Sequence, residues 1–293
     1  PLKVFNAYNS AYDCTDKPTV ILAFTVKGYG IGSRQADNTT HQVKKLTEEN
    51  LKDFIKNFNL PIDAKNLKKL DYLKLNKNSK EYKYLINQRN KLGGFLPRRE
   101  ITKHSLKPND NIHFDEFNLQ SKREMSTTMV FVRLITSLLR DKKIGKNIVP
   151  IVPDEARTFG MDGLFRQFGI YSREGQKYQP EDAEKVMWYR ESEDGVMLEE
   201  GINEAGAFSA WIALATSYAN NSLPMIPFYI YYSMFGFQRV HDLAWAAGDA
   251  RAKGFLLGAT SGRTTLNGEG LQHQDGHSHL LAQTIPNCKS YDP

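Results

Sequence analysis

The 293-residue chain has only two cysteines, Cys14 and Cys288, and neither belongs to a CxxC pair. This scarcity argues against a disulfide framework and a structural zinc site, and it fits a reducing, cytoplasmic location. Long apolar runs are missing as well. Residues 20–26 and 225–232 fall well short of the ~18–20 residues that span a bilayer. We therefore expect no transmembrane helix, no secretory signal and no membrane partner.

Charge is distributed unevenly along a chain of otherwise ordinary globular composition. Residues 1–149 carry 28 basic and 15 acidic side chains, a net charge of +13, whereas residues 150–293 carry a net charge of −7. A basic half is compatible with a non-catalytic module that binds nucleic acid or an acidic protein. The lysines are scattered and do not alternate with aromatics along one stripe, which favours a solvated surface. We therefore expect no nucleic-acid partner.

The length suggests about two domains. Residues 95–123 combine prolines and charges with few periodic apolar positions, so they are interpreted as a segment crossing between domains. The chain starts at Pro1 without Met and stops shortly after an apolar stretch. This indicates an internal piece of a longer polypeptide.

The second half alternates between strand and helix patterns. Apolar and β-branched runs predict strands at residues 148–152, 225–231 and 255–259. Helices are expected between and around them, at residues 126–140, 158–168, 205–219 and 236–253. Right-handed crossovers of this kind give a parallel α/β sheet, with ligands at the carboxyl ends of the strands.

The first half is predicted to contain a buried strand at residues 19–26, followed by a loop to residue 40. Helices are expected at about residues 51–58, after the capping segment 47–50, and at residues 81–92. The glycines at 28, 30 and 32 follow the strand as in a dinucleotide loop, but Ser33 stands where the further glycine is needed. No GxxxxGK[ST] sequence is present, so a Walker-type phosphate loop is excluded.

Several polar residues fall where a parallel sheet places its ligands. Asp154 and Glu155 follow the strand at 148–152, where adjacent carboxylates form either a surface turn or a site. Glu204 starts an apolar helix, where it is either a helix-dipole partner or a carboxylate that shares a proton with a ligand nitrogen. Tyr232 and Phe235 emerge beyond the strand at 225–231, either as core or as a stacking surface for a flat ring.

Histidines cluster near the end of the chain. His273, His277 and His279 lie within seven residues, but without the HExxH frame of a metal site, so a loop of proton donors is favoured over a metal centre or a solvated loop. His41 ends the loop in the first half, either as a surface residue or as part of a lid.

Taken together, these stretches closely resemble the homodimeric, bacterial-type pyruvate dehydrogenase, the thiamine-diphosphate component of the pyruvate dehydrogenase complex. The resemblance runs from about residue 15 to the end. It is carried by residues 24–30, 224–239 and 259–273, and by His41-Gln42-Val43-Lys44-Lys45, Asp154-Glu155-Ala156-Arg157-Thr158-Phe159-Gly160-Met161, Gly201-Ile202-Asn203-Glu204 and Asp275-Gly276-His277-Ser278-His279.

The resemblance implies a thiamine-diphosphate-binding, transketolase-like fold with parallel sheets flanked by helices, incomplete at both ends. Residues 1–110 would be the last part of the diphosphate-binding domain plus a linker, and residues 111–293 a truncated pyrimidine-binding domain. The implied activity is oxidative decarboxylation of pyruvate, with acetyl transfer to the lipoyl group of the acyltransferase partner. A transketolase-like transferase shares the architecture and remains an alternative.

The resemblance also implies roles for single residues. Glu204 matches the glutamate that bonds the aminopyrimidine of the cofactor, and Phe235 matches the aromatic stacked on that ring. Tyr232 and His273 match groups around the substrate, His41 a histidine linked to acetyl transfer, and Lys27 a lysine near the cofactor. Acidic residues at the edge of the active centre are matched by Asp154, Glu155 and Glu269.

One part of the family pattern is missing. The magnesium and diphosphate motif, a Gly-Asp-Gly followed by an Asn, does not occur, so magnesium ligands are expected outside these residues and none within them. The family's C-terminal domain and early substrate-side histidines are missing too. A piece of this extent is expected to be inactive alone. The family places its cofactor between two subunits, which implies a homodimer.

Overall fold

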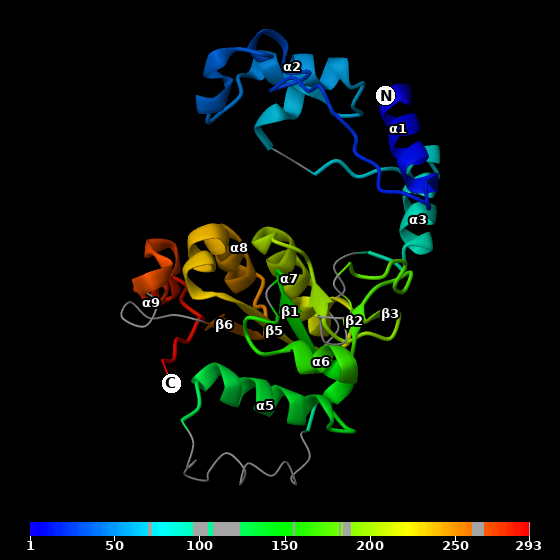
Figure 1. Ribbon diagram of the computed structural model, residues 1–293. Helices are drawn as coiled ribbons and strands as arrows, with labels where there is room; N and C mark the ends of the chain where they lie inside the picture. Colours follow the sequence, from blue (N-terminus) through cyan, green and yellow to red (C-terminus); the bar gives the residue numbers. More distant parts are fainter. Residues whose placement is uncertain are drawn as a thin grey trace. The chain divides into compact units, whose positions relative to one another are not determined.

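The computed structural model describes residues 1–69, 72–95, 105–107, 124–154, 156–181, 183, 189–259 and 267–292. The chain divides into two compact units, residues 1–96 and 97–293 (Figure 1). Glu155 and most of the expected crossing segment 95–123 lie outside the described residues.

The first unit is built from helices and short turns. Its helices are α1 (Leu2–Asp13), α2 (Glu48–Asn57) and α3 (Lys80–Lys91). The hydroxyls of Thr47 and Ser79 accept backbone N–H groups at 3.2 and 3.1 Å, which satisfies donors at the starts of α2 and α3. Gly93 ends α3 with a positive φ of 83°. The two predicted helices are confirmed, whereas α1 was not anticipated from the sequence.

The buried strand predicted at residues 19–26 is wrong for this structure. The segment has no strand conformation, and its large apolar side chains are exposed, with Leu22 at 92% and Phe24 at 101% exposure. A strand needs a neighbouring strand for its backbone hydrogen bonds, and the described residues of the first unit contain none. The β propensity of residues 19–26 is therefore not enough to form a strand here, because no partner strand is available among the described residues.

The second unit is organised around a four-stranded parallel sheet. Its order is β4-β1-β5-β6, and every pairing is parallel. The strands are β1 (Ile148–Val152), β4 (Leu198–Glu199), β5 (Ile226–Tyr232) and β6 (Phe255–Ala259). A separate parallel pair joins β2 (Ile170–Tyr171) to β3 (Glu191–Ser192). The three long strands confirm the prediction; strands of two residues carry too little pattern to be found in advance.

Helices cover both faces of this sheet (Figure 1). They are α5 (Thr127–Leu139), α6 (Asp162–Gln167), α7 (Glu204–Asn220), α8 (Phe237–Asp249) and α9 (Ser278–Gln283). The helix predicted at 158–168 begins late, because Gly160 adopts a positive φ of 71° in the turn before it. The predicted α/β class, with a parallel sheet between helices, is confirmed. Among the described residues, no helix is both long and apolar enough to cross a bilayer.

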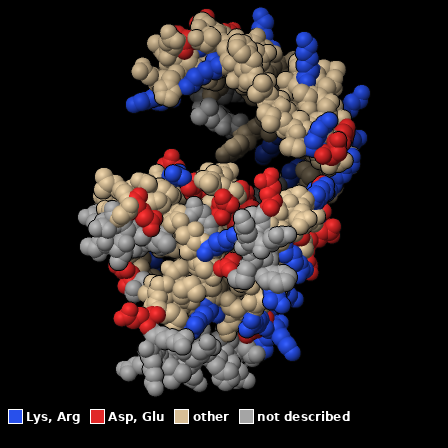
Figure 2. Space-filling model, viewed as in Figure 1, with Lys and Arg blue, Asp and Glu red and all other residues tan. Residues whose placement is uncertain are grey.

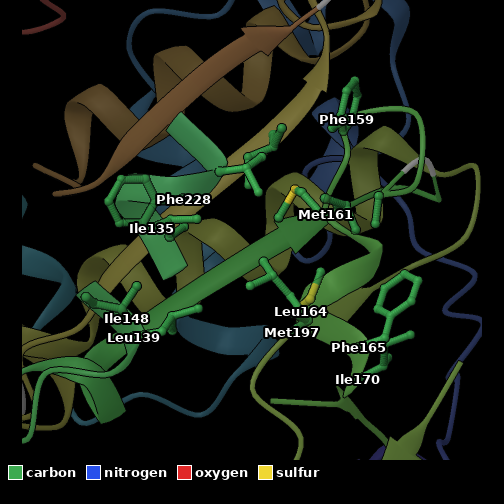
Figure 3. Close-up of a cluster of buried hydrophobic side chains, with 14 of the residues drawn as sticks. Ile135, Leu139, Ile148, Phe159, Met161, Leu164, Phe165, Ile170, Met197 and Phe228 are labelled. Carbon is green, nitrogen blue, oxygen red and sulfur yellow. The ribbon is translucent and has the colours of Figure 1, made fainter. Parts of the chain in front are cut away.

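Two hydrophobic cores form because successive side chains of a strand point to opposite faces. Figure 3 shows the first core, where Ile148 of β1 and Phe228 of β5 pack with Ile135 of α5 and Leu164 of α6. On the other face, the core combines residues of β1 and β5 with residues of α7 and α8: Ile151, Tyr229, Tyr231, Phe208, Trp211, Val240 and Ala244. The sheet is thus held rigidly from both sides, which fixes where its strands end.

Truncation of a central core side chain tests this packing. Ile151→Ala removes a fully buried side chain from β1, so we expect the free energy of unfolding to fall by about 2–5 kcal/mol. Ile202→Ala is the matched control, because Ile202 is 72% exposed and should change stability by less than about 0.5 kcal/mol. Urea unfolding of both variants gives the comparison. Equal losses would contradict the assigned core.

Candidate functional site

The carboxyl end of β5 presents an aromatic surface. The strand ends at Tyr232, a 3-10 turn η5 (Ser233–Phe235) follows, and Gly236 leads into α8. A Cβ atom at Gly236 would lie 2.0 Å from the ring of Tyr231, so glycine lets the backbone pass this close to the ring. Tyr232 and Phe235 consequently lie just beyond the strand, at the edge where parallel sheets bind ligands.

His273 packs against this surface from a distant part of the sequence. It ends the 3-10 turn η7 (Leu271–His273), and its ring centroid lies 5.1 Å from that of Tyr232 and 5.6 Å from that of Phe235. Its Nδ1 atom is buried and has no hydrogen-bond partner among the described residues. Because an unpaired buried nitrogen is costly, it is typical of a group that interacts with a ligand.

Glu204 lies at the first position of α7, where Asn203 already provides the helix cap. The Asn203 side chain accepts the Gly206 N–H at 3.0 Å, so the Glu204 carboxylate is not needed for capping. That carboxylate is only 12% exposed and forms an ion pair with Arg239. Although Glu204 starts an apolar helix, its carboxylate therefore has a charged partner.

Arg239 links Glu204 to the aromatic surface. Its guanidinium carbon lies 4.2 Å from the centroid of the Phe235 ring, a cation–π contact. The structure therefore gathers Glu204, Tyr232, Phe235 and His273 into one cluster in the second unit. Sequence reasoning missed Arg239, since no local signal pairs it with a carboxylate 35 residues away.

Two predicted residues of the first unit also meet. The Lys27 Nζ and His41 Nδ1 atoms are 2.7 Å apart, and both side chains are exposed. Two hydrogen bonds hold the glycine-rich loop that separates them: the Gly30 N–H donates to Gln35 within the loop at 2.9 Å, and the Gly30 carbonyl accepts from Asn57 of α2 at 3.0 Å. Lys27 and His41 form a small basic pair at the ends of that loop.

The remaining predicted residues do not join the aromatic cluster. Asp154 is exposed directly after β1, and Glu269 is exposed in a turn before Gly270. His277 and His279 are exposed as well. Within the part of the chain that the structure describes, no three His, Cys, Asp or Glu side chains are grouped so that they could hold a metal ion.

Glu199 is an unusual carboxylate that sequence reasoning did not single out. It ends β4, beside β1, with Val152 as its register partner. Burial raises its pKa to about 7, the nearby Asp154 carboxylate adds to this shift, and Arg157 opposes it. Only the pairing of β4 with β1 brings these charges together.

Stability should therefore depend on pH through Glu199. The pKa of Glu199 is near the ordinary 4.5 in the unfolded chain and about 7 in the folded protein. The free energy of unfolding should therefore fall as the pH rises from about 4.5 to about 7. Glu199→Gln removes the titration, and the variant should gain stability relative to the native protein across this window. Urea unfolding at several pH values measures the difference. Glu200→Gln, at the exposed neighbour, serves as the control, and a pH-independent difference for Glu199→Gln would contradict the assignment.

Comparisons with known proteins match the whole chain. Residues 109–293 match the family model of the pyruvate dehydrogenase E1 component middle domain. Proteins named pyruvate dehydrogenase E1 component are similar throughout: that of Pseudomonas aeruginosa is 57% identical over 295 residues, that of Cupriavidus necator 54% over 296 and that of Escherichia coli K12 52% over 295. Each match covers 100% of this chain but 33% of the relative, so the chain spans about a third of their length. These names do not favour the transketolase-like or basic-module alternatives.

Proposed function

Since this chain belongs to the family of the pyruvate dehydrogenase E1 component, we propose that the protein containing it decarboxylates pyruvate oxidatively on thiamine diphosphate. The acetyl group would pass to the lipoyl group of an acyltransferase partner in a pyruvate dehydrogenase complex. The observation that carries the proposal is the cluster of Glu204, Phe235, Tyr232 and His273 at the carboxyl end of the sheet.

The residues of this cluster fit the aminopyrimidine end of thiamine diphosphate. A flat heteroaromatic ring needs an apolar face to stack on, and Phe235 offers one beside the cationic Arg239. A basic ring nitrogen needs a carboxyl group that can share a proton with it, and the Glu204 carboxyl group is largely shielded from water. The unpaired Nδ1 of His273 leaves a hydrogen-bonding atom for the substrate side.

Each residue contributes a distinct step to the proposed chemistry. When bound, thiamine diphosphate would supply an acidic carbon as nucleophile toward the keto group of pyruvate, and a positively charged ring that would hold the electron pair left behind when CO₂ departs. Glu204 shares a proton with the pyrimidine nitrogen and so sets its tautomer. Tyr232 and His273 place hydrogen-bonding groups around the substrate oxygen, where negative charge develops. Phe235 would orient the ring by stacking against its face.

The remaining assignments extend this proposal to residues outside the cluster. Lys27 would lie near the cofactor, and Asp154, Glu155 and Glu269 would line the edge of the active centre. Magnesium would be bound through residues outside this chain, since the motif that carries it is not in the sequence. Residues 1–110 and 111–293 would belong to two cofactor-binding domains of a homodimer. The small number of cysteines supports a cytoplasmic location.

Glu204→Gln in the full-length protein tests the central role. The variant keeps the size of the side chain but cannot share a proton with the ring nitrogen, so kcat should fall by about 100- to 10,000-fold. Pyruvate-dependent reduction of an artificial electron acceptor measures this step. Glu200→Gln, four residues earlier on the exposed surface, should retain activity. An unchanged rate in Glu204→Gln would refute the assigned role.

His41→Ala tests acetyl transfer separately. Because His41 is proposed to act only when the lipoyl group arrives, the variant should keep artificial-acceptor reduction while losing most transfer to an isolated lipoyl domain. Mass spectrometry of the lipoyl domain measures acetylation. His279→Ala is the control, since His279 is also exposed but lies outside the proposed machinery. Parallel loss of both activities in His41→Ala would contradict the separation.

A further inference from the structure

We propose that Ser233 and Asp275 are a pair of positioning residues that hold His273 against Tyr232 and Phe235. The Ser233 hydroxyl donates a hydrogen bond to Oδ2 of Asp275, across 42 residues of sequence. Neither residue belongs to the roles assigned above. The inference rests on the proposed function, because it concerns the geometry of the same active centre.

The position of each partner makes this bond effective. Ser233 directly follows Tyr232 and precedes Phe235 by two residues, within η5. Asp275 follows His273, the last residue of η7, by two residues. The bond therefore joins the two turns that carry the three rings, close to the ring contacts themselves. A displacement of either turn would change the 5.1 and 5.6 Å separations at His273.

Ser233 is itself held in a tightly packed place. It is only 6% exposed, and a Cβ atom at Gly258 of β6 would lie 2.8 Å from its Oγ and 2.9 Å from its own Cβ. The backbone of β6 thus packs directly against this serine. Ser278 adds a second link, because its hydroxyl donates to the Ser233 carbonyl at 3.3 Å. Ser233 therefore contacts the sheet on one side and the loop that follows His273 on the other, so the sheet fixes where that loop lies.

Asp275 organises its own loop with its second oxygen. Its Oδ1 accepts the backbone N–H groups of His277 and Ser278 at 2.9 and 3.1 Å. Partial burial alone would raise the pKa of Asp275, but the hydrogen bonds from Ser233, Ser278 and the two backbone groups outweigh it and lower the pKa to about 2. The carboxylate therefore stays ionised, and one side chain connects the sheet edge to the start of α9.

The first experiment measures pyruvate-dependent acceptor reduction in the full-length protein. Ser233→Ala and Asp275→Ala should each lower kcat by about 10- to 100-fold, since misplacement of a reacting group by about 1 Å has effects of this size. The double variant should be no worse than the poorer single variant. Asp275→Asn should recover much of the loss, because it keeps an oxygen for the backbone N–H groups and a polar group for Ser233.

Two controls separate positioning from general loosening. Thr284→Ala removes the 3.0 Å contact with His241, which joins α8 to the end of α9 and involves none of the three rings, and it should retain kcat. In a His273→Ala background, Ser233→Ala should cause no further loss, because its effect is exerted through the imidazole. An equal loss in Thr284→Ala, or the same fold-loss with and without His273, would overturn the proposal.

A second measurement does not depend on the proposed function. Hydrogen–deuterium exchange should become faster at the backbone N–H groups of His277 and Ser278 in Ser233→Ala, and stay unchanged in Thr284→Ala. If the native protein showed no activity with pyruvate, the proposed function would fail. The exchange rates would still show whether the Ser233–Asp275 hydrogen bond holds the loop after His273. Unchanged exchange in Ser233→Ala would overturn the positioning inference alone.

Discussion

Strand β5 is the element on which the second unit depends, because it is hydrogen-bonded on both sides, to β1 and to β6. Its backbone groups are satisfied by parallel pairing, and its side chains supply both cores, with Phe228 on one face and Tyr229 on the other. A strand held in this way cannot slip by one residue without turning its apolar side chains to the wrong face. The point where β5 ends, at Tyr232, is therefore fixed by the whole sheet.

The candidate site uses this fixed point as its base. Tyr232 and Phe235 follow the strand directly, whereas Glu204 comes from the start of α7 and His273 from a later turn. α7 packs on β5 through Phe208, whose ring meets Tyr229 edge-on at 5.6 Å, one helical turn from Glu204. Packing of the apolar helix face thus brings the carboxylate to the aromatic surface. Two polar groups then orient the side chains that packing has brought together. Arg239 contacts Phe235, and Asp275 accepts the hydrogen bond of Ser233 beside Tyr232.

Charge is arranged differently in the two units. On the face shown in Figure 2, basic side chains project separately from the first unit and acidic side chains are frequent on the second. Dispersed lysines are well solvated and give weak individual interactions. In the second unit, by contrast, the partly buried Glu199 and Asp275 have altered pKa values. Burial and hydrogen bonding, rather than net charge, set their protonation.

Local pattern predicted the long elements well. The sequence predicted the strand at Ile148–Val152 and the helix capped by Ser126. Both signals, apolar periodicity and helix capping, depend on only a few neighbouring residues. The same reasoning failed for residues 19–26, where strand propensity had no partner strand. The two-residue strand β4, and with it Glu199, escaped notice because so short a strand exists only through its pairing with β1.

The sequence by itself determined which side chains we propose to carry chemistry, since the carboxylate at Glu204 and the imidazole at His273 stand out within short motifs. It did not determine what holds them. The contacts of Arg239 with Glu204 and of Ser233 with Asp275 join residues 35 and 42 positions apart. Such pairs are created only when parallel crossovers bring distant segments to one sheet edge, since hydrogen bonds and ion pairs act over a few ångströms of space and are indifferent to distance along the chain.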